Sequence, residues 1–224
     1  MSDDLEQRPF NPELADNPEP RVALALVLDS SGSMSGDPIR QLNEGLKVLE
    51  EELKADSLAS KRVEIAIITF GPVKIETDFT PAAHFFSPEI TASGDTPMGA
   101  AIETALDLLN ARKQEYIRNG IGYYQPWLFV ITDGAPTDSY TAAASRIKEL
   151  DPKKLSAFAV AVEGGDLNIL RKIFVREPLK LKGLSFGELF RWVSASMKAV
   201  SGSRPGEGVE LSPPTGPNGW ATTG

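Results

Sequence analysis

The stretch VALALVLDSSGSMSGDPIRQL, residues 22–42, decides the fold. Its first seven residues are all apolar, as in a strand that is covered on both faces of a parallel sheet. The run ends in Asp29, and a glycine and several hydroxyl side chains follow at once. Asp37 and Pro38 then offer an N-cap and a first-turn proline for a helix whose leucines recur at helical spacing. The stretch therefore predicts a strand, a polar loop and a helix, in that order.

The alternation of buried strands and amphipathic helices continues along the chain. Further strands are expected at residues 62–70, 73–79, 127–132, 155–162 and 179–181, and further helices from Pro97 and at residues 140–150, 166–174 and 186–200. Gly71 and Pro72 indicate a tight turn, so the second and third strands are expected to form a hairpin. This order predicts an α/β fold in which helices cover both faces of a doubly wound, mostly parallel sheet.

Three regions differ in composition. Residues 1–20 are acidic and rich in proline, and we expect them to form an arm that lies on the domain or is disordered. Residues 21–201 carry the alternating pattern and form the predicted domain. Residues 202–224 are rich in glycine, proline, serine and threonine, so we expect a flexible tail without packed structure.

Composition narrows the classes of function. The formal net charge is -8 and no basic run stands out, which argues against nucleic acid as a partner. The absence of cysteine excludes disulfides, thiolate metal sites and cysteine nucleophiles. The amino terminus does not resemble a signal peptide and no apolar stretch is long enough to span a bilayer, so we expect a cytoplasmic protein without a membrane partner.

Polar clusters lie where ligands bind in sheets of this type, outside the carboxyl ends of the strands. The clusters are DSSGS at residues 29–33, SGDTP at residues 93–97 and TDG at residues 132–134. Together they offer an all-oxygen set, namely Asp29, Ser31, Ser33, Thr96 and Asp133. Oxygen donors suit a hard divalent cation, with Mg²⁺ first and Mn²⁺ or Ca²⁺ as alternatives, rather than zinc or copper.

The same residues match a known pattern. Asp29-x-Ser31-x-Ser33, with Thr96 in GDTPMG and Asp133 in TDG, resembles the metal-ion-dependent adhesion site of von Willebrand factor A (VWA) domains. The residue sequences of these motifs look most like those of the bacterial tellurite-resistance-associated (TerY-like) subfamily.

That resemblance carries several expectations. It implies one antiparallel strand at the sheet edge. It also implies that Ser31, Ser33 and Thr96 are direct or near-direct ligands, with Asp29 and Asp133 acting through water or hydrogen bonds. Its implied function is binding of a protein partner through the metal, without catalysis. Because neutral hydroxyl ligands leave the ion electrophilic, we expect the partner to offer an acidic or phosphorylated group. In the subfamily, the implied partners are a protein kinase and a metal-dependent phosphatase.

Other readings of the motifs stay open. A phosphoaspartate phosphatase needs a second Asp where Ser31 stands, and a GxSxG hydrolase needs Ser where Met34 stands, so we expect no enzyme. A metal-dependent phosphohydrolase or a domain with a merely stabilising metal is the alternative. Thr96 has a rival role as the N-cap of the helix from Pro97, and Asp138 is expected to cap the helix that follows it.

Overall fold

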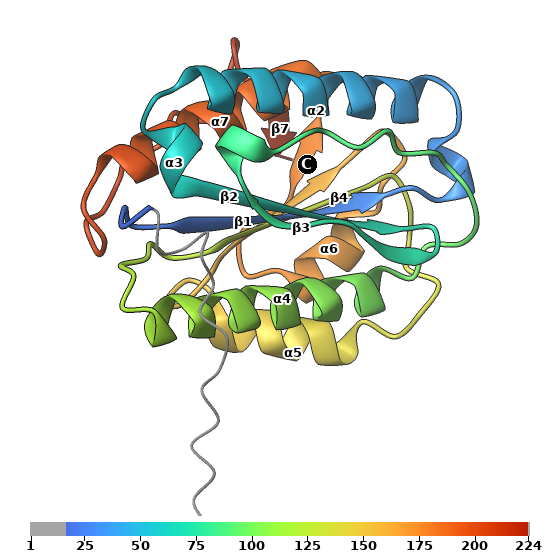
Figure 1. The fold of residues 1–224 in the computed structure, drawn as a ribbon. Helices are drawn as coiled ribbons and strands as arrows, with labels where there is room; N and C mark the ends of the chain where they lie inside the picture. Colours follow the sequence, from blue (N-terminus) through green and yellow to red (C-terminus); the bar gives the residue numbers. More distant parts are fainter. Residues whose placement is uncertain (1–16, 224) are drawn as a thin grey trace, which may run out of the picture.

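A seven-stranded sheet forms the middle layer of the protein, whose computed structural model describes residues 17–223 (Figure 1). The strands are β1 (Val22–Asp29), β2 (Val63–Phe70), β3 (Val73–Pro81), β4 (Trp127–Thr132), β5 (Ser156–Ala161), β6 (Leu179–Leu181) and β7 (Ala221–Thr223). Their spatial order is β3-β2-β1-β4-β5-β6-β7, with antiparallel pairing only at the two edges, β2 with β3 and β6 with β7. The predicted fold class is confirmed, and β7 adds a second antiparallel edge strand.

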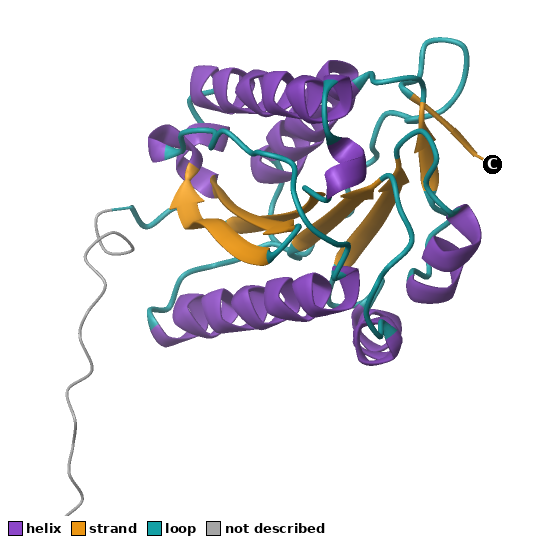
Figure 2. Ribbon diagram, turned by 90° about the vertical axis from the view of Figure 1, so that its right-hand side faces the viewer, coloured by secondary structure: helices purple, strands orange, loops and turns teal. Residues whose placement is uncertain are grey.

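Helices cover both faces of the sheet (Figures 1 and 2). On one face lie α2 (Asp37–Ala55) and α7 (Phe186–Gly202), and on the other lie α4 (Met98–Arg118), α5 (Thr141–Leu150) and α6 (Leu167–Ile173). Short helices complete the chain, namely α3 (Ala59–Arg62), η1 (Gly32–Met34) and η2 (Ala82–His84). Among the described residues, no helix combines the length and the apolar character that crossing a membrane would require.

Strand β1 shows why its sequence is apolar without interruption. Alternate side chains point to opposite faces of a strand. Leu24, Leu26 and Leu28 accordingly join the core under α2 and α7, whereas Ala25 and Val27 join the core over α4. Because both faces of β1 are covered by helices and excluded from water, apolar residues are favoured at every position until the strand reaches its polar end.

The tail after α7 differs from its expected flexible state. Strand β7 pairs with β6, and Trp220 is only 5% exposed, with its ring 5.8 Å from that of Trp192. The Trp192 indole donates to the carbonyl oxygen of Ser212 at 2.7 Å, and Lys182 donates to that of Gly216 at 2.8 Å. The prediction of no packed structure beyond residue 201 is wrong for the described residues, because burying an indole of roughly 150–250 Å² offsets the ordering of the tail.

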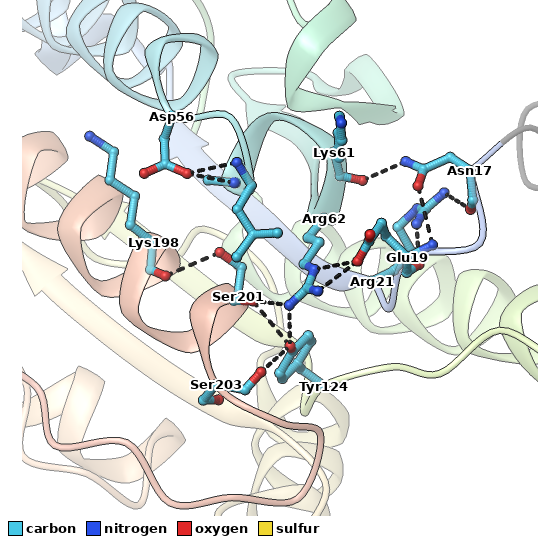
Figure 3. Close-up of polar contacts among 12 residues, drawn as sticks. Asn17, Glu19, Arg21, Asp56, Lys61, Arg62, Tyr124, Lys198, Ser201 and Ser203 are labelled. Carbon is cyan, nitrogen blue, oxygen red and sulfur yellow. Dashed lines mark hydrogen bonds and ion pairs between the residues drawn. The ribbon is translucent and has the colours of Figure 1, made fainter.

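Arg62 ties three segments together at the amino-terminal end of the sheet (Figure 3). Its guanidinium donates to the Glu19 carboxylate at 2.9 and 2.6 Å and to the carbonyl oxygen of Ser201 at 2.6 Å. The Tyr124 hydroxyl donates to the carbonyl oxygen of Ser203 at 2.6 Å. The residues just before β1 and the end of α7 therefore belong to the packed domain, whereas the remainder of the predicted arm, residues 1–16, lies outside the described residues.

A buried ionic cluster lies beside this end. Glu64 is fully buried, and its carboxylate accepts from Arg112 at 2.7 and 2.9 Å and from the Tyr116 hydroxyl. Arg21 lies 3.3 Å away. Burial raises the pKa of Tyr116 well above its ordinary value, and the charge of Glu64 adds to that rise. The phenol is therefore kept protonated as a donor to the buried carboxylate.

Candidate metal centre

Two neighbouring strands carry the candidate site. β1 and β4 are parallel, with Leu28 opposite Ile131, so the next residues, Asp29 and Thr132, lie side by side where both strands end. Asp133 follows immediately. The predicted convergence of the first and third polar clusters at one edge of the sheet is therefore what the strand register produces.

Asp29 is a fully buried residue of the site, at the end of β1. Its side chain is buried, its Oδ1 accepts from the backbone N–H of Ser31 at 2.9 Å, and its Oδ2 accepts from the hydroxyl of Thr132 at 2.6 Å. Burial raises the pKa of Asp29 above its ordinary value, the hydrogen bonds from Ser31 and Thr132 oppose the rise, and the charge of Asp133 adds to it. The carboxylate thus orients the loop rather than facing solvent.

Thr132 is a residue whose role sequence reasoning missed. Besides its bond to Asp29, its Oγ1 accepts from the backbone N–H of Gly134 at 3.2 Å. One hydroxyl therefore links the buried carboxylate to the loop after β4. The sequence places Thr132 in the TDG cluster at the end of an apolar run, but its role can be recognised only once β4 is known to lie beside β1.

A chain of polar contacts leads outward from the loop. The Oγ atoms of Ser31 and Ser33 are 3.0 Å apart, and the Ser33 hydroxyl donates to Asp133 Oδ1 at 2.8 Å. Ser33 is exposed, whereas Ser31 is buried. The single turn of η1 brings the two hydroxyls to the same side, with the buried Met34 holding the turn against the core.

Thr96 reaches the same place from a long loop. Two backbone contacts hold that loop against the first cluster: Ser93 N–H donates to the Ser30 carbonyl at 2.7 Å, and Gly32 N–H donates to the Gly94 carbonyl at 3.0 Å. A Cβ added to Gly134 would lie 3.7 Å from Thr96 Oγ1, so this hydroxyl faces the backbone after Asp133. The structure therefore links Asp29, Ser31, Ser33 and Asp133 through hydrogen bonds, and it places the fifth predicted residue, Thr96, beside the backbone that follows Asp133.

Three capping expectations need correction. Thr96 does not cap α4: the N-cap position is Pro97, and the free N–H groups of Gly99 and Ala100 are bound by the Asp138 carboxylate.

Asp138 was expected to cap the helix after it, but the N-cap of α5 is Tyr140, which makes no side-chain cap. Asp37 is the first residue of α2 rather than its N-cap and pairs with Arg40 at 2.9 Å, because Gly36 takes the N-cap position with a φ of 87°. In each case the loop path, which local sequence does not reveal, decides which helix end a carboxylate reaches.

The donors present fit a small hard cation. Two neighbouring ligands of an octahedral ion with bonds of about 2.1 Å are about 3.0 Å apart. The Oγ atoms of Ser31 and Ser33, which share a hydrogen bond, are separated by the same 3.0 Å. Among the described residues no group of three or more His, Cys, Asp or Glu side chains could hold a metal, so hydroxyl oxygens would have to supply part of the coordination.

The fold and the polar edge define an α/β domain of the doubly wound class with a site outside the carboxyl ends of its parallel strands. Within that class, residues 23–181 match the model of the von Willebrand factor type A domain. The chain therefore belongs to this family, whose members commonly act as metal-dependent protein-interaction modules.

Solved structures share the fold at low identity. The pilus adhesin SpaC of Lactobacillus rhamnosus GG has a TM-score of 0.65 at 13% identity, over 82% of this chain and 31% of that one. A von Willebrand factor type A protein from Catenulispora acidiphila has a TM-score of 0.60 at 17% identity, over 80% and 43%. Proximal thread matrix protein 1 of the mussel byssus, with a zinc-occupied MIDAS motif, has a TM-score of 0.53 at 13% identity, over 80% and 48%.

These matches establish the fold alone. The chain spans about half or less of the length of these three proteins. A comparison with curated proteins gives no match.

Proposed function

We propose that this domain is a cation-dependent protein-binding module that recognises an acidic or phosphorylated group on a partner. One observation carries the proposal: the hydroxyls of Ser31 and Ser33, which share a 3.0 Å hydrogen bond beside Asp133, have a separation that adjacent ligands of a hard cation also adopt. A bound divalent ion would supply an electrophilic centre that attracts an anionic oxygen from outside. We expect Mg²⁺ first, with Mn²⁺ or Ca²⁺ as alternatives.

Each residue has a distinct part in this proposal. Ser31, Ser33 and Thr96 offer neutral oxygens, which leave the positive charge of an ion largely uncompensated. Asp29 holds the backbone of Ser31 and the hydroxyl of Thr132, and so fixes the loop. Asp133 accepts from Ser33 and balances charge at the exposed side. This division leaves the site attractive to a partner's carboxylate or phosphate.

The surface beside the site has room for a partner. A hollow of about 500 Å³ begins at Ser35 and Gly36, two residues beyond Ser33, and continues between α2 and the loop before Thr96. Its walls include the apolar side chains of Ile39 and Ile90. Residues that flank a partner's acidic group could pack there while the acid faces the site.

Catalysis is not part of the proposal. The one histidine of the chain, His84, is exposed at the end of η2 and is not among the residues gathered at the site. The finer predictions stay proposals: a cytoplasmic location, membership of the tellurite-resistance-associated (TerY-like) group, and a kinase or phosphatase as partner. The alternatives are a metal-dependent phosphohydrolase and a domain that a metal only stabilises.

Calorimetric titration of chelator-treated protein with Mg²⁺, Mn²⁺ and Ca²⁺ tests the proposal. A Ser31→Ala, Ser33→Ala double variant is expected to lose at least tenfold in affinity, because two of the oxygen donors are removed. Ser35→Ala is the matched control, since Ser35 is an exposed serine of the same loop. Equal binding by the double variant and the wild type, or no binding by the wild type, would contradict the proposal.

Two further assays separate the alternatives. Turnover of p-nitrophenyl phosphate with Mn²⁺ that disappears in Asp29→Ala would favour the phosphohydrolase. A higher melting temperature with metal, together with partner capture that chelator does not change, would favour a purely stabilising ion.

A further inference from the structure

The loop after β4 grips the loop that carries Thr96. The backbone N–H of Thr137 donates to the Thr96 carbonyl oxygen at 2.9 Å, and the Thr96 N–H donates to Thr137 Oγ1 at 3.2 Å. The next residue, Asp138, accepts from the N–H groups of Gly99 and Ala100 at 2.9 and 2.8 Å. Four hydrogen bonds therefore join the loop after β4 to Thr96 and to the first turn of α4, about forty residues earlier in the sequence and on both sides of the Thr96–Pro97 bond.

Gly99 makes the close approach possible. A Cβ at this position would lie 2.3 Å from the carbonyl oxygen of Ser139 and 3.0 Å from the Cα atom of Tyr140. Because a side chain cannot fit there, the chain after Asp138 can run directly over the first turn of α4. The carboxylate is thereby brought within reach of the two free N–H groups, and its negative charge lies at the positive end of a 21-residue helix.

Thr96 depends on such contacts more than the other candidate ligands do. Ser31 and Ser33 follow β1 directly, and Asp133 follows β4, so adjacent parallel strands fix their places. Thr96 lies at the end of a loop without helix or strand that starts after η2. Its position is set on one side by the Ser30 and Gly32 backbone contacts and on the other side by Thr137 and Asp138.

We propose that Asp138, together with Thr137, is a positioning residue that sets the distance between Thr96 Oγ1 and Asp133, and thereby the affinity of the site for a divalent cation. The inference rests on the proposed function. Both oxygens of Asp138 accept from backbone N–H groups at the start of α4, so the effect that we infer runs through α4 and Thr96.

Mn²⁺ titration of Asp138→Ala tests this inference, with Asp95→Ala as the matched control. Asp95 is an exposed acid next to Thr96, so its removal makes the same change of charge close to the site. We expect the dissociation constant to rise at least tenfold in Asp138→Ala and less than threefold in Asp95→Ala. Asp138→Asn keeps one acceptor oxygen and is expected to fall between them, and it replaces the alanine variant if that one fails to fold.

A second readout works without metal. In ¹H–¹⁵N spectra of the metal-free protein, Asp138→Ala is expected to move the Thr96 amide signal and to speed exchange of the Gly99 and Ala100 amides, whereas Asp95→Ala is not. A lower melting temperature with unchanged Mn²⁺ affinity would overturn the inference, since Asp138 would then only cap a helix. If the wild type binds no Mn²⁺, both the proposed function and the inferred effect on affinity fail. The amide signals alone then show whether the contacts of Thr137 and Asp138 position Thr96.

Discussion

Gly71 lies beneath the two loops of the candidate site, and replacing it with alanine is expected to destabilise the protein. A Cβ at this position would lie 2.5 Å from the carbonyl oxygen of Ser93 and 2.7 Å from both the carbonyl oxygen and Oγ of Ser30. Those groups are backbone or adjacent to it, and Ser30 and Ser93 are themselves joined by a 2.7 Å hydrogen bond. The absence of a side chain at Gly71 thus lets the backbones of Ser30 and Ser93 approach closely. This requirement comes on top of the turn that the sequence predicts at residues 71–72.

The size of the effect follows from the distances. Since contacts under 3.0 Å are essentially absent and ordinary contact begins near 3.4 Å, the Ser93 carbonyl must retreat by about 0.5 to 0.9 Å. Overpacking of this kind costs about 1–3 kcal/mol, and loosening the Ser93–Ser30 bond places the total near 3 kcal/mol. For a chain of this length each kcal/mol corresponds to about 2–4 °C, so the melting temperature should fall by about 6–12 °C.

Urea unfolding and thermal melting of Gly71→Ala measure this effect. Gly202→Ala is the control: this exposed glycine ends α7 and a Cβ there would meet nothing within 4 Å, so alanine should be neutral or slightly stabilising. The Mn²⁺ affinity of Gly71→Ala should also fall, because Ser30 precedes Ser31 and Ser93 leads to Thr96. Wild-type stability in Gly71→Ala would refute the reasoning, since the two loop backbones would then yield without cost.

Two other substitutions test different parts of the structure. Trp220→Ala should lower the free energy of unfolding by about 3 kcal/mol, at the low end for a buried tryptophan because its indole N–H has no hydrogen-bond partner among residues 17–223. Thermal melting checks this, and an unchanged melting temperature would mean that the tail contributes no packing. The raised pKa of Tyr116 means that the folded protein keeps a proton that the unfolded chain releases above its ordinary pKa of 10.0, so stability should fall as pH rises past that value. Urea unfolding between about pH 9 and pH 11 should show a shallower decline in Tyr116→Phe, and equal slopes would contradict the assignment.

The sequence predicts most of the fold because the strands of a doubly wound sheet are buried on both faces. The five strands with parallel neighbours, β1, β2, β4, β5 and β6, begin and end within one residue of their expected ranges, and Gly71 and Pro72 indicate the hairpin of β2 and β3. Strand β7 gives no such signal. It has three residues in a segment rich in glycine and proline, and it exists because β6 has a free edge and Trp220 has a ring to pack against.

For the candidate site, too, the sequence predicts some residues and not others. Asp29, Ser31 and Ser33 are close in sequence, and their pattern can be read directly. The parts that position them cannot, because they come from contacts between elements: Thr132 reaches Asp29 through the register of β4 on β1, and Asp138 reaches the start of α4 through the path of a loop. Composition favours a polar edge to the sheet, but only the arrangement of strands and loops decides which carboxylate serves which partner.

The candidate ligands are held in two different ways, and this difference bears on how the cation affinity of the site can change. The donors that follow β1 and β4 are fixed by the parallel pairing of these strands in the middle of the sheet. A shift of either strand would break backbone hydrogen bonds of the sheet and disturb the hydrophobic packing on both of its faces. Thr96 is held by loop contacts, through Gly94 and Ser93 on one side and Thr137 on the other, and by the first turn of α4, where the Met98 N–H donates to its carbonyl oxygen at 2.8 Å. Loop contacts can be altered at far lower cost than a central strand pair. The affinity of such a site should therefore be tuned mainly through the surroundings of Thr96, and substitutions at Thr137 or Asp138 should change cation binding more than equally exposed substitutions elsewhere on the same face.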